Sequence, residues 1–382
     1  MENDEIKIEK RILNKLESKF KKDKSNPVAK QLYKDQVKRV KRLITEKRNQ
    51  FIHDTMRNKN SNTFWTMVKK LMNNKSQLST ISPEVYNNYY TNVAKKLLNN
   101  TAKSTQELTE YLENNQQIKN NLSEFHQIDL DTMKELIKWL KNGKIGSCGI
   151  HTKVLKILSP FISPILLKCF NDCIINSSFP HGLKQADIIP VPKKPKPKDN
   201  ADYRPISIQS ILSKVFESAL LKQIQAFVDK TNPFQHQFGF GPGFSTVSLL
   251  RRTNNIINNN LNKGLLTILI SLDFSKAFDT IAHHILLAKL LSLGFSQSAT
   301  KLMLSYLRPR TVRTISCNEK SQPCEVYAGV PQGSILGPIL FNLYTHDITE
   351  DIPSNATLLQ YADDTQIILS FDNHQEVRTI IQ

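Results

Sequence analysis

The stretch that decides the fold is LLQYADDTQIIL, residues 358–369. Apolar residues on both sides flank a short polar centre, which is typical of a β-hairpin whose turn carries Asp363 and Asp364. Aspartate is common in turns, so the two adjacent carboxylates could simply be turn formers. The aliphatic and β-branched flanks, together with Tyr361 two residues earlier, favour a further role for this pair.

A third carboxylate, Asp273, stands at the end of the apolar run LTILISLD, residues 266–273. The carboxyl end of a strand is where α/β proteins place ligand-binding groups, although an aspartate there can also cap a helix. Asp273 and Asp363 are 90 positions apart in the chain. They can therefore form one site only if both segments fold onto one sheet.

The third notable segment is AGVPQGSILGPIL, residues 328–340. Its glycines permit a tight turn and a close backbone approach. Ser334 can cap the helix that follows, and Pro338 suits the first turn of that helix. An ordinary strand-to-helix loop explains the glycines, but it does not explain Pro331-Gln332-Gly333 between them.

Around these segments, strands and helices alternate. Short β-like runs are predicted at 186–191, 265–273, 325–330 and 358–369, and helices at 213–228, 245–261, 283–293 and 338–348. This alternation predicts an α/β (α+β) domain.

The upstream part is helical in pattern. Apolar residues between Phe64 and Met72 share one helical face. Asp131 is expected to cap a helix that stops at Gly143, and a second helix is expected over 153–158, with Pro160 and Pro164 breaking the pattern.

The charge is concentrated at the N-terminus. The chain of 382 residues carries a net charge of +18, and residues 1–75 hold 21 Lys and Arg against 9 Asp and Glu, a net +12. This asymmetry favours a polyanionic partner, nucleic acid first. No secretory signal is expected, since the first residues contain no apolar segment, and the apolar run 265–272 is too short to span a membrane. The five cysteines lack zinc-ligand spacing and are expected to be free thiols in a reducing compartment.

In this order, the Asp-ended strand, the Pro-Gln-Gly loop and the Ala-Asp-Asp hairpin resemble the palm motifs of reverse transcriptases. Residues 184–194 and 202–207 resemble the fingers of that family, and Phe64-Trp65 with 69–71 resembles the lead-in of jockey-type non-LTR retrotransposons. The clear resemblance covers about residues 174–382.

The resemblance implies an incomplete right-hand polymerase. A basic helical extension is expected over 1–125, a helical lead-in over 126–173 and the reverse transcriptase domain over 174–382. Within that domain we expect fingers at 174–264 and an incomplete palm at 265–382. The chain stops 18 residues after Asp364, so the thumb is expected to be missing, and no endonuclease is expected before residue 1.

The resemblance also implies a two-metal site. Asp273, Asp363 and Asp364 are the expected catalytic carboxylates, and the Phe274 backbone carbonyl is expected to join them as a metal ligand. The cofactor is expected to be two Mg²⁺ ions, which prefer oxygen ligands, and Mn²⁺ can substitute.

The same resemblance gives four residues nucleotide-binding roles. Arg204 is expected to bind the incoming triphosphate, and Phe278 to exclude a 2′-hydroxyl, unless it is an ordinary core aromatic. Gln332 and Gly333 are expected to contact the nascent base pair and the template. By contrast, we interpret Asp279 and His283 as structural.

The function implied is RNA-directed DNA synthesis for a non-LTR retrotransposon, with an RNA template, a DNA primer and dNTP as partners and no membrane. An element-encoded nucleocapsid-like protein is a further expected partner, and the nucleus and cytoplasmic ribonucleoprotein are the expected locations. Two alternatives stay open. One is a truncated, non-catalytic RNA-binding relic of such an element. The other is a group II intron-type reverse transcriptase, against which the jockey-like lead-in argues.

Overall fold

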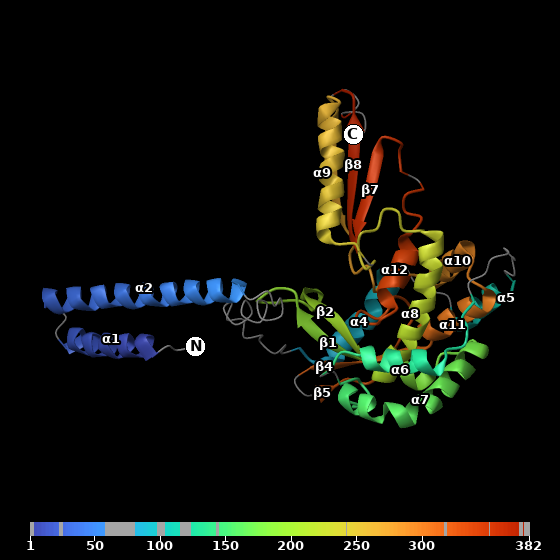
Figure 1. The fold of residues 1–382 in the computed structure, drawn as a ribbon, viewed down its shortest axis with the longest axis horizontal. Helices are drawn as coiled ribbons and strands as arrows, with labels where there is room; N and C mark the ends of the chain where they lie inside the picture. The colour runs from blue at the N-terminus through green and yellow to red at the C-terminus, as the bar shows by residue number, and fades with distance from the viewer. Residues whose placement is uncertain are drawn as a thin grey trace. The chain divides into compact units, whose positions relative to one another are not determined.

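The computed structural model describes residues 4–22, 26–57, 81–97, 104–114, 124–142, 145–241, 243–316, 319–350, 352–373 and 377. The chain divides into two compact units, Met1–Ser76 and Gln77–Gln382 (Figure 1). The apolar face expected between Phe64 and Met72 lies outside the described residues. The three predicted domain boundaries stay predictions, although residues 83–114, inside the predicted extension, belong to the second unit.

The first unit contains a pair of packed helices, α1 (Asp4–Lys22) and α2 (Pro27–Arg57). Phe20 stacks on Tyr33 with ring centroids 5.6 Å apart, and Arg39 pairs with Glu9 at 3.0 Å. Four lysines of α2 remain exposed on its outer side: Lys30, Lys34, Lys38 and Lys41. The helical pattern predicted for this basic region is thus present over both ranges.

The second unit alternates helices and strands, as predicted. Its helices are α4 (Pro83–Leu97), α5 (Thr105–Asn114), α6 (Leu130–Trp139), α7 (Thr152–Ile175), α8 (Ile211–Thr231), α9 (Thr246–Asn262), α10 (His283–Leu293), α11 (Gln297–Leu307) and α12 (Gly337–Thr345). Its strands are β1 (Ala186–Pro192), β2 (Tyr203–Gln209), β3 (Leu266–Asp273), β4 (Arg310–Ser316), β5 (Glu319–Lys320), β6 (Cys324–Val326), β7 (Ala356–Tyr361) and β8 (Asp364–Phe371).

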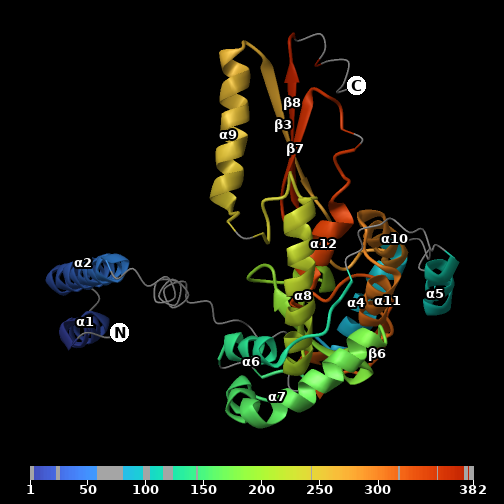
Figure 2. The same ribbon diagram turned by 45° about the vertical axis from the view of Figure 1, so that its right-hand side comes forward.

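Two sheets organise this unit. The first is antiparallel, in the order β3-β8-β7, and α9 lies along it (Figures 1 and 2). Leu249 of α9 packs there against Leu359 and Ile368. The second sheet has the order β2-β1-β4-β5, with β6 also paired to β4. In it β1 is antiparallel to β2 and parallel to β4.

The main core lies among the helices. Phe216 of α8 stacks on Phe170 and on Phe179, with ring centroids 4.6 Å and 5.0 Å away. Buried residues of α10, α11 and α12 join the same cluster. Burying so many apolar side chains supplies the main driving force for folding this unit, because each large side chain contributes roughly 1.5–3 kcal/mol.

The predicted start and end of α6 were wrong. Asp129, rather than Asp131, caps the helix, because its carboxylate accepts from the Thr132 amide and hydroxyl, both at 2.7 Å. Asp131 lies in the first turn, where a negative charge favours the helix dipole. The helix ends at Trp139, since Leu140 already turns to an extended ψ of 135°.

The break predicted at Pro160 and Pro164 was also wrong, because α7 continues through both prolines. Each proline removes one backbone hydrogen bond, and this usually breaks a helix. Here both prolines lie on the exposed side, where water can satisfy the freed carbonyls. The opposite side is fixed by buried residues such as Leu155 and Phe170, so tertiary packing outweighs the local penalty.

Four further elements were missed, namely β2, β4, α11 and the two-residue strand β5. The proline of YRPISIQ argues against a strand, yet β2 forms at the sheet edge, where a missing N–H is tolerated. Every second residue of β4 is buried, but three of these four residues are polar: Arg310, Thr314 and Ser316. The sequence therefore shows no alternation of apolar and polar residues at this strand. Helix α11 was not predicted. The strand predicted at 325–330 is shorter, since β6 ends at Val326.

Helix α7 bears on the question of membranes. In the part of the chain that the structure describes, it is the one helix long and apolar enough to cross a bilayer by length and composition. Lysines, serines and prolines interrupt its apolar residues, so no continuous apolar run marks it in the sequence. Phe170 and Ile174 of this helix belong to the main core, and 17% of its apolar window is buried.

Candidate functional site

The antiparallel sheet brings the predicted carboxylates together. In the β3–β8 register, Asp273 lies directly opposite Asp364. Opposite residues on neighbouring antiparallel strands have Cβ atoms roughly 4.5–5.5 Å apart. Asp363 occupies the turn between β7 and β8, next to Ala362, whose φ of +58° makes the turn tight. The predicted hairpin is therefore confirmed.

A buried glutamine braces this turn. The Gln237 side-chain oxygen accepts from the amides of Ala362, at 2.8 Å, and Gly239, at 2.7 Å, while its nitrogen donates to the Ala362 carbonyl. Gly239 leaves no room beside the turn, because a Cβ there would lie 2.3 Å from the Ala362 nitrogen. The segment between α8 and α9 thus fixes the position of Asp363.

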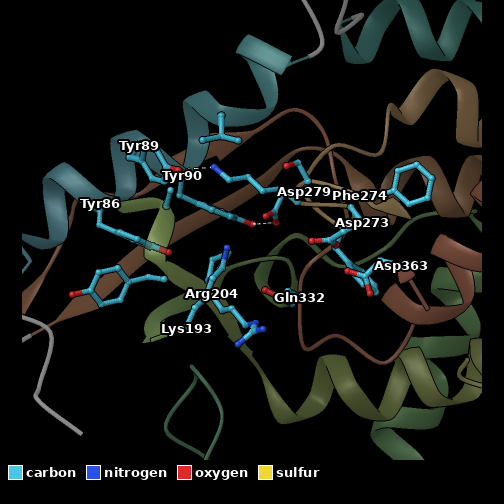
Figure 3. Close-up of a pocket in the computed structure, with 18 residues that line it drawn as sticks. Tyr86, Tyr89, Tyr90, Lys193, Arg204, Asp273, Phe274, Asp279, Gln332 and Asp363 are labelled. Carbon is cyan, nitrogen blue, oxygen red and sulfur yellow. Dashed lines mark hydrogen bonds between the residues drawn. The ribbon is translucent and has the colours of Figure 1, made fainter. Parts of the chain in front are cut away.

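A pocket of about 360 Å³ opens beside these carboxylates. Six of the predicted site residues line it: Arg204, Asp273, Phe274, Phe278, Gln332 and Asp363. Asp364 and Gly333 adjoin the pocket without lining it. Figure 3 shows Asp273 and Asp363 close together on one side, with Lys193 and Arg204 on the other. The pocket therefore has an acidic side and a basic side.

The Pro-Gln-Gly loop lies between β2 and the loop after β3. The Gln332 carbonyl accepts from the Ser207 amide at 2.8 Å, and Val330 donates to the Phe278 carbonyl at 2.8 Å. Gly333 has a φ of +112°, and a Cβ there would lie 2.9 Å from the Ser207 carbonyl oxygen. This conformation and this close approach require glycine.

A buried glutamate holds the end of that loop. The Glu217 carboxylate of α8 accepts from the amides of Ile335 and Leu336, at 2.8 and 3.2 Å. Ser213 and Gln209 donate to its other oxygen. Glu217 thereby satisfies amides just before α12 that would otherwise be buried without a partner.

Phe278 has both a core side and a pocket side. Its ring stacks on Phe341 with centroids 5.0 Å apart and meets Phe240 edge-on at 6.1 Å. It packs against the main core and lines the pocket. The two interpretations of Phe278, core aromatic and sugar-contacting ring, are therefore both compatible with its position.

His283 and Asp279 support the loops around the site. His283 is buried, its Nε2 faces the Gly329 carbonyl at 2.8 Å, and its Nδ1 accepts from Arg308 at 2.8 Å. Burial, together with the Arg308 charge, lowers the His283 pKa to about 3, so the ring stays neutral. Asp279 accepts a 3.4 Å bond from the Tyr90 hydroxyl, and burial raises its pKa to about 6.

Sequence reasoning missed the wall that α4 contributes. Tyr86, Tyr89 and Tyr90 line the pocket, and Figure 3 shows them on its far side from Asp273 and Asp363. Lys276, in the loop after β3, donates to the Tyr89 hydroxyl at 2.6 Å. The repeated tyrosines of the helical segment VYNNYY were the only available signal, and they do not reveal a partner nearly 190 residues away.

The side chains beside the pocket that could bind a metal ion are carboxylates, which offer oxygen atoms as ligands. Within the described residues, no group of three or more His, Cys, Asp or Glu side chains stands close enough to hold a metal ion. Asp273 and Asp363 nevertheless border the same pocket, and Asp364 is paired to Asp273 in the sheet. Carboxylate oxygens are the ligands that Mg²⁺ prefers, so these residues fit a hard divalent cation.

Comparisons with known proteins identify the family of this chain. The family model described as reverse transcriptase (RNA-dependent DNA polymerase) matches residues 191–382, half of the chain. A probable RNA-directed DNA polymerase from transposon BS of Drosophila melanogaster is 31% identical over 64% of this chain and 28% of its own length. The RNA-directed DNA polymerase from mobile element jockey of the same fly is 30% identical, over 69% of this chain and 29% of its own length.

A third relative, the probable polymerase from transposon X-element of that fly, is 31% identical over 60% of this chain and 26% of its own length. The chain thus spans less than a third of the length of these relatives. The matched region includes Arg204, the Pro-Gln-Gly loop and all three aspartates. Because the family model and the folded motifs agree, the chain belongs to the reverse transcriptase family, and its relatives are the polymerases of jockey, BS and X-element non-LTR retrotransposons.

Proposed function

We propose that this chain carries the nucleotidyl-transfer site of an RNA-directed DNA polymerase. At this site the 3′-hydroxyl of a DNA primer, paired with an RNA template, loses its proton and its oxygen bonds to the α-phosphorus of a dNTP. The bond from that phosphorus to the β-phosphate oxygen breaks, and pyrophosphate leaves. The observation that carries this proposal is the register of β3 and β8, which sets Asp273 opposite Asp364, with Asp363 in the adjoining turn. The same pocket holds Arg204, so carboxylates and a guanidinium face one space.

The acidic side of the pocket suits metal ions, and the basic side suits the triphosphate of a nucleotide. Two Mg²⁺ ions, or Mn²⁺, would be held by Asp273, Asp363 and Asp364 with the Phe274 carbonyl, and would lower the pKa of the primer hydroxyl and neutralise phosphate charge. Arg204 on the opposite side binds the triphosphate, since a planar guanidinium forms paired bonds to phosphate oxygens.

The remaining residues orient the substrate. Gln332 and Gly333 contact the nascent base pair and the template from a loop fixed to Ser207. Phe278 lies against the sugar and leaves no space for a 2′-hydroxyl. Orientation of this kind contributes to the rate because the reacting groups are already aligned.

Primer extension on an RNA template tests the proposal. The chain is assayed as it stands and joined to the C-terminal remainder of the jockey relative, in Mg²⁺ and in Mn²⁺. We expect Asp273→Asn and Asp363→Asn to abolish extension, because an amide cannot neutralise a cation. Asp229→Asn is the matched control, since this exposed aspartate of α8 bonds only to Gln225 in the described structure.

Extension that survives Asp273→Asn would overturn the assignment. If neither wild-type protein extends a primer but both bind RNA, the non-catalytic relic is the better description. In that case binding should depend on the +12 charge of residues 1–75. The binding constant K falls as the salt concentration rises, so log K against log salt has a negative slope. Replacing Lys30, Lys34, Lys38 and Lys41 by glutamine should then make this slope shallower by about three to four.

We also propose an intracellular ribonucleoprotein, in the nucleus and the cytoplasm, in which an element-encoded nucleocapsid-like protein assists. The described cysteines, Cys148, Cys169, Cys173 and Cys324, are free thiols, which suits a reducing compartment. Crosslinking of RNA to the protein in separated nuclear and cytoplasmic fractions checks this. Recovery in neither fraction would contradict it.

A further inference from the structure

Lys276 has an unusual backbone for a lysine. Its φ is +55°, in the left-handed region that residues with a side chain seldom adopt. Its carbonyl accepts from the amides of Asp279 and Thr280, at 2.8 and 3.2 Å, which closes a tight turn directly after β3. Such conformations persist only where the surroundings impose them, and they concentrate at binding sites.

The side chain of Lys276 is held on the pocket wall by α4. Its ammonium donates to the Tyr89 hydroxyl at 2.6 Å and lies 4.4 Å from the centre of the Tyr89 ring. Both residues line the pocket that contains Asp273 and Arg204. The cation is therefore fixed at this cavity by a hydroxyl and an aromatic face, with two donor positions left on the ammonium.

Helix α4 is itself firmly attached on either side of Tyr89. Tyr90 donates to Asp279, and Tyr86 meets Tyr203 of β2 edge-on at 6.0 Å. Asn87 is buried, donates to the Gln322 carbonyl at 3.0 Å and accepts from Thr314 at 3.1 Å. Because α4 is bonded to both the second sheet and the loop after β3, Tyr89 can act as a rigid support.

We propose that Lys276 is a further phosphate-contacting residue of this pocket and that Tyr89 positions it. With Lys193 and Arg204 it gives the cavity three basic side chains facing a triphosphate, and one of them depends on a helix outside the family-matched region 191–382. This inference rests on the proposed nucleotide-binding function. It assigns α4 a part in binding the substrate as well as in folding.

The test measures binding and catalysis separately. Isothermal calorimetry with inorganic triphosphate gives a dissociation constant without any turnover. We expect Lys276→Met to weaken this binding about tenfold, which is the usual weight of one charge-assisted hydrogen bond. Lys276→Arg should keep most of the affinity, since it retains the charge. Tyr89→Phe keeps the ring and removes the hydroxyl. We expect a weakening of about threefold, because the ammonium keeps its charge and loses only one of the two contacts that hold it in place.

Two controls separate positioning from stability. Lys222→Met removes an exposed lysine of α8, and Tyr327→Phe removes a hydroxyl that donates to Glu325 outside the pocket. Both should bind triphosphate as the wild type does. In primer extension, Tyr89→Phe should raise KM for dNTP more than it lowers kcat, with an unchanged melting temperature.

Unchanged triphosphate affinity in both Lys276→Met and Tyr89→Phe overturns the inference. If Lys276→Met does not fold, Tyr89→Phe alone decides, because it removes a single oxygen. The proposed polymerase function fails on different data, namely extension that persists in Asp273→Asn. The two ideas can therefore fail independently.

Discussion

Replacing Gly239 by alanine should displace the turn that carries Asp363. The added Cβ would lie 2.3 Å from the Ala362 nitrogen and 2.9 Å from its Cα, both backbone atoms. Ordinary contact needs about 3.5 Å, so the two segments must separate by about 1 Å. The movement would also strain the bonds from the Ala362 and Gly239 amides to Gln237.

The expected cost follows from these contacts. Overpacking typically destabilises by about 1–3 kcal/mol, and each weakened hydrogen bond contributes about 1 kcal/mol. We therefore expect about 3–5 kcal/mol of lost stability and a melting temperature roughly 5–8 °C lower. A shift of about 1 Å in a reacting group costs about a hundredfold in rate, so kcat for RNA-templated extension should fall about that far.

Thermal melting and single-nucleotide extension, measured side by side, check both figures. Gly182→Ala is the matched control, because a Cβ at Gly182 meets nothing within 4 Å and Gly182 has an ordinary φ. If Gly239→Ala melts and extends like Gly182→Ala, then the brace at Ala362 does not position Asp363. A loss of stability without any loss of rate would refute the link between the brace and the carboxylate.

Two more predictions concern the loop after β3. Phe278→Val should admit ribonucleotides while some dNTP incorporation remains, because selection by a clash is lost when the ring is removed. The alternative is that the free energy of unfolding falls by the ~3–5 kcal/mol typical of a truncated core aromatic while the ratio of rNTP to dNTP incorporation stays the same. In that case Phe278 belongs to the core only. Asp279 has a folded pKa of about 6 against 3.8 unfolded, so its contribution to stability is largest below pH 4 and is lost as the pH rises through 6. Asp279→Asn should therefore gain stability relative to the wild type between pH 4 and 7, by roughly 3 kcal/mol at most, and parallel melting curves of the two proteins over that range would contradict this.

The segments that form the candidate site could be predicted because each of them is short and has a local pattern. The Ala-Asp-Asp hairpin follows from apolar flanks around a polar turn, and β3 follows from an apolar run ending in Asp273. The Pro-Gln-Gly loop follows from glycines whose positive φ no other residue adopts easily. Each of these signals depends on neighbours within about a dozen residues, so a single sequence contains them.

The supports of the site depend on contacts that are distant in the chain, and only the tertiary structure decided them. Gln237 reaches Ala362 across 125 residues, and Tyr89 reaches Lys276 across 187. Helix α7 runs through two prolines because burial on one side outweighs a local penalty. The sequence by itself therefore determined which carboxylates and loops gather at this pocket. Which buried side chains hold them in place was decided by packing, since a hydrogen-bond partner more than a hundred residues away leaves no local pattern.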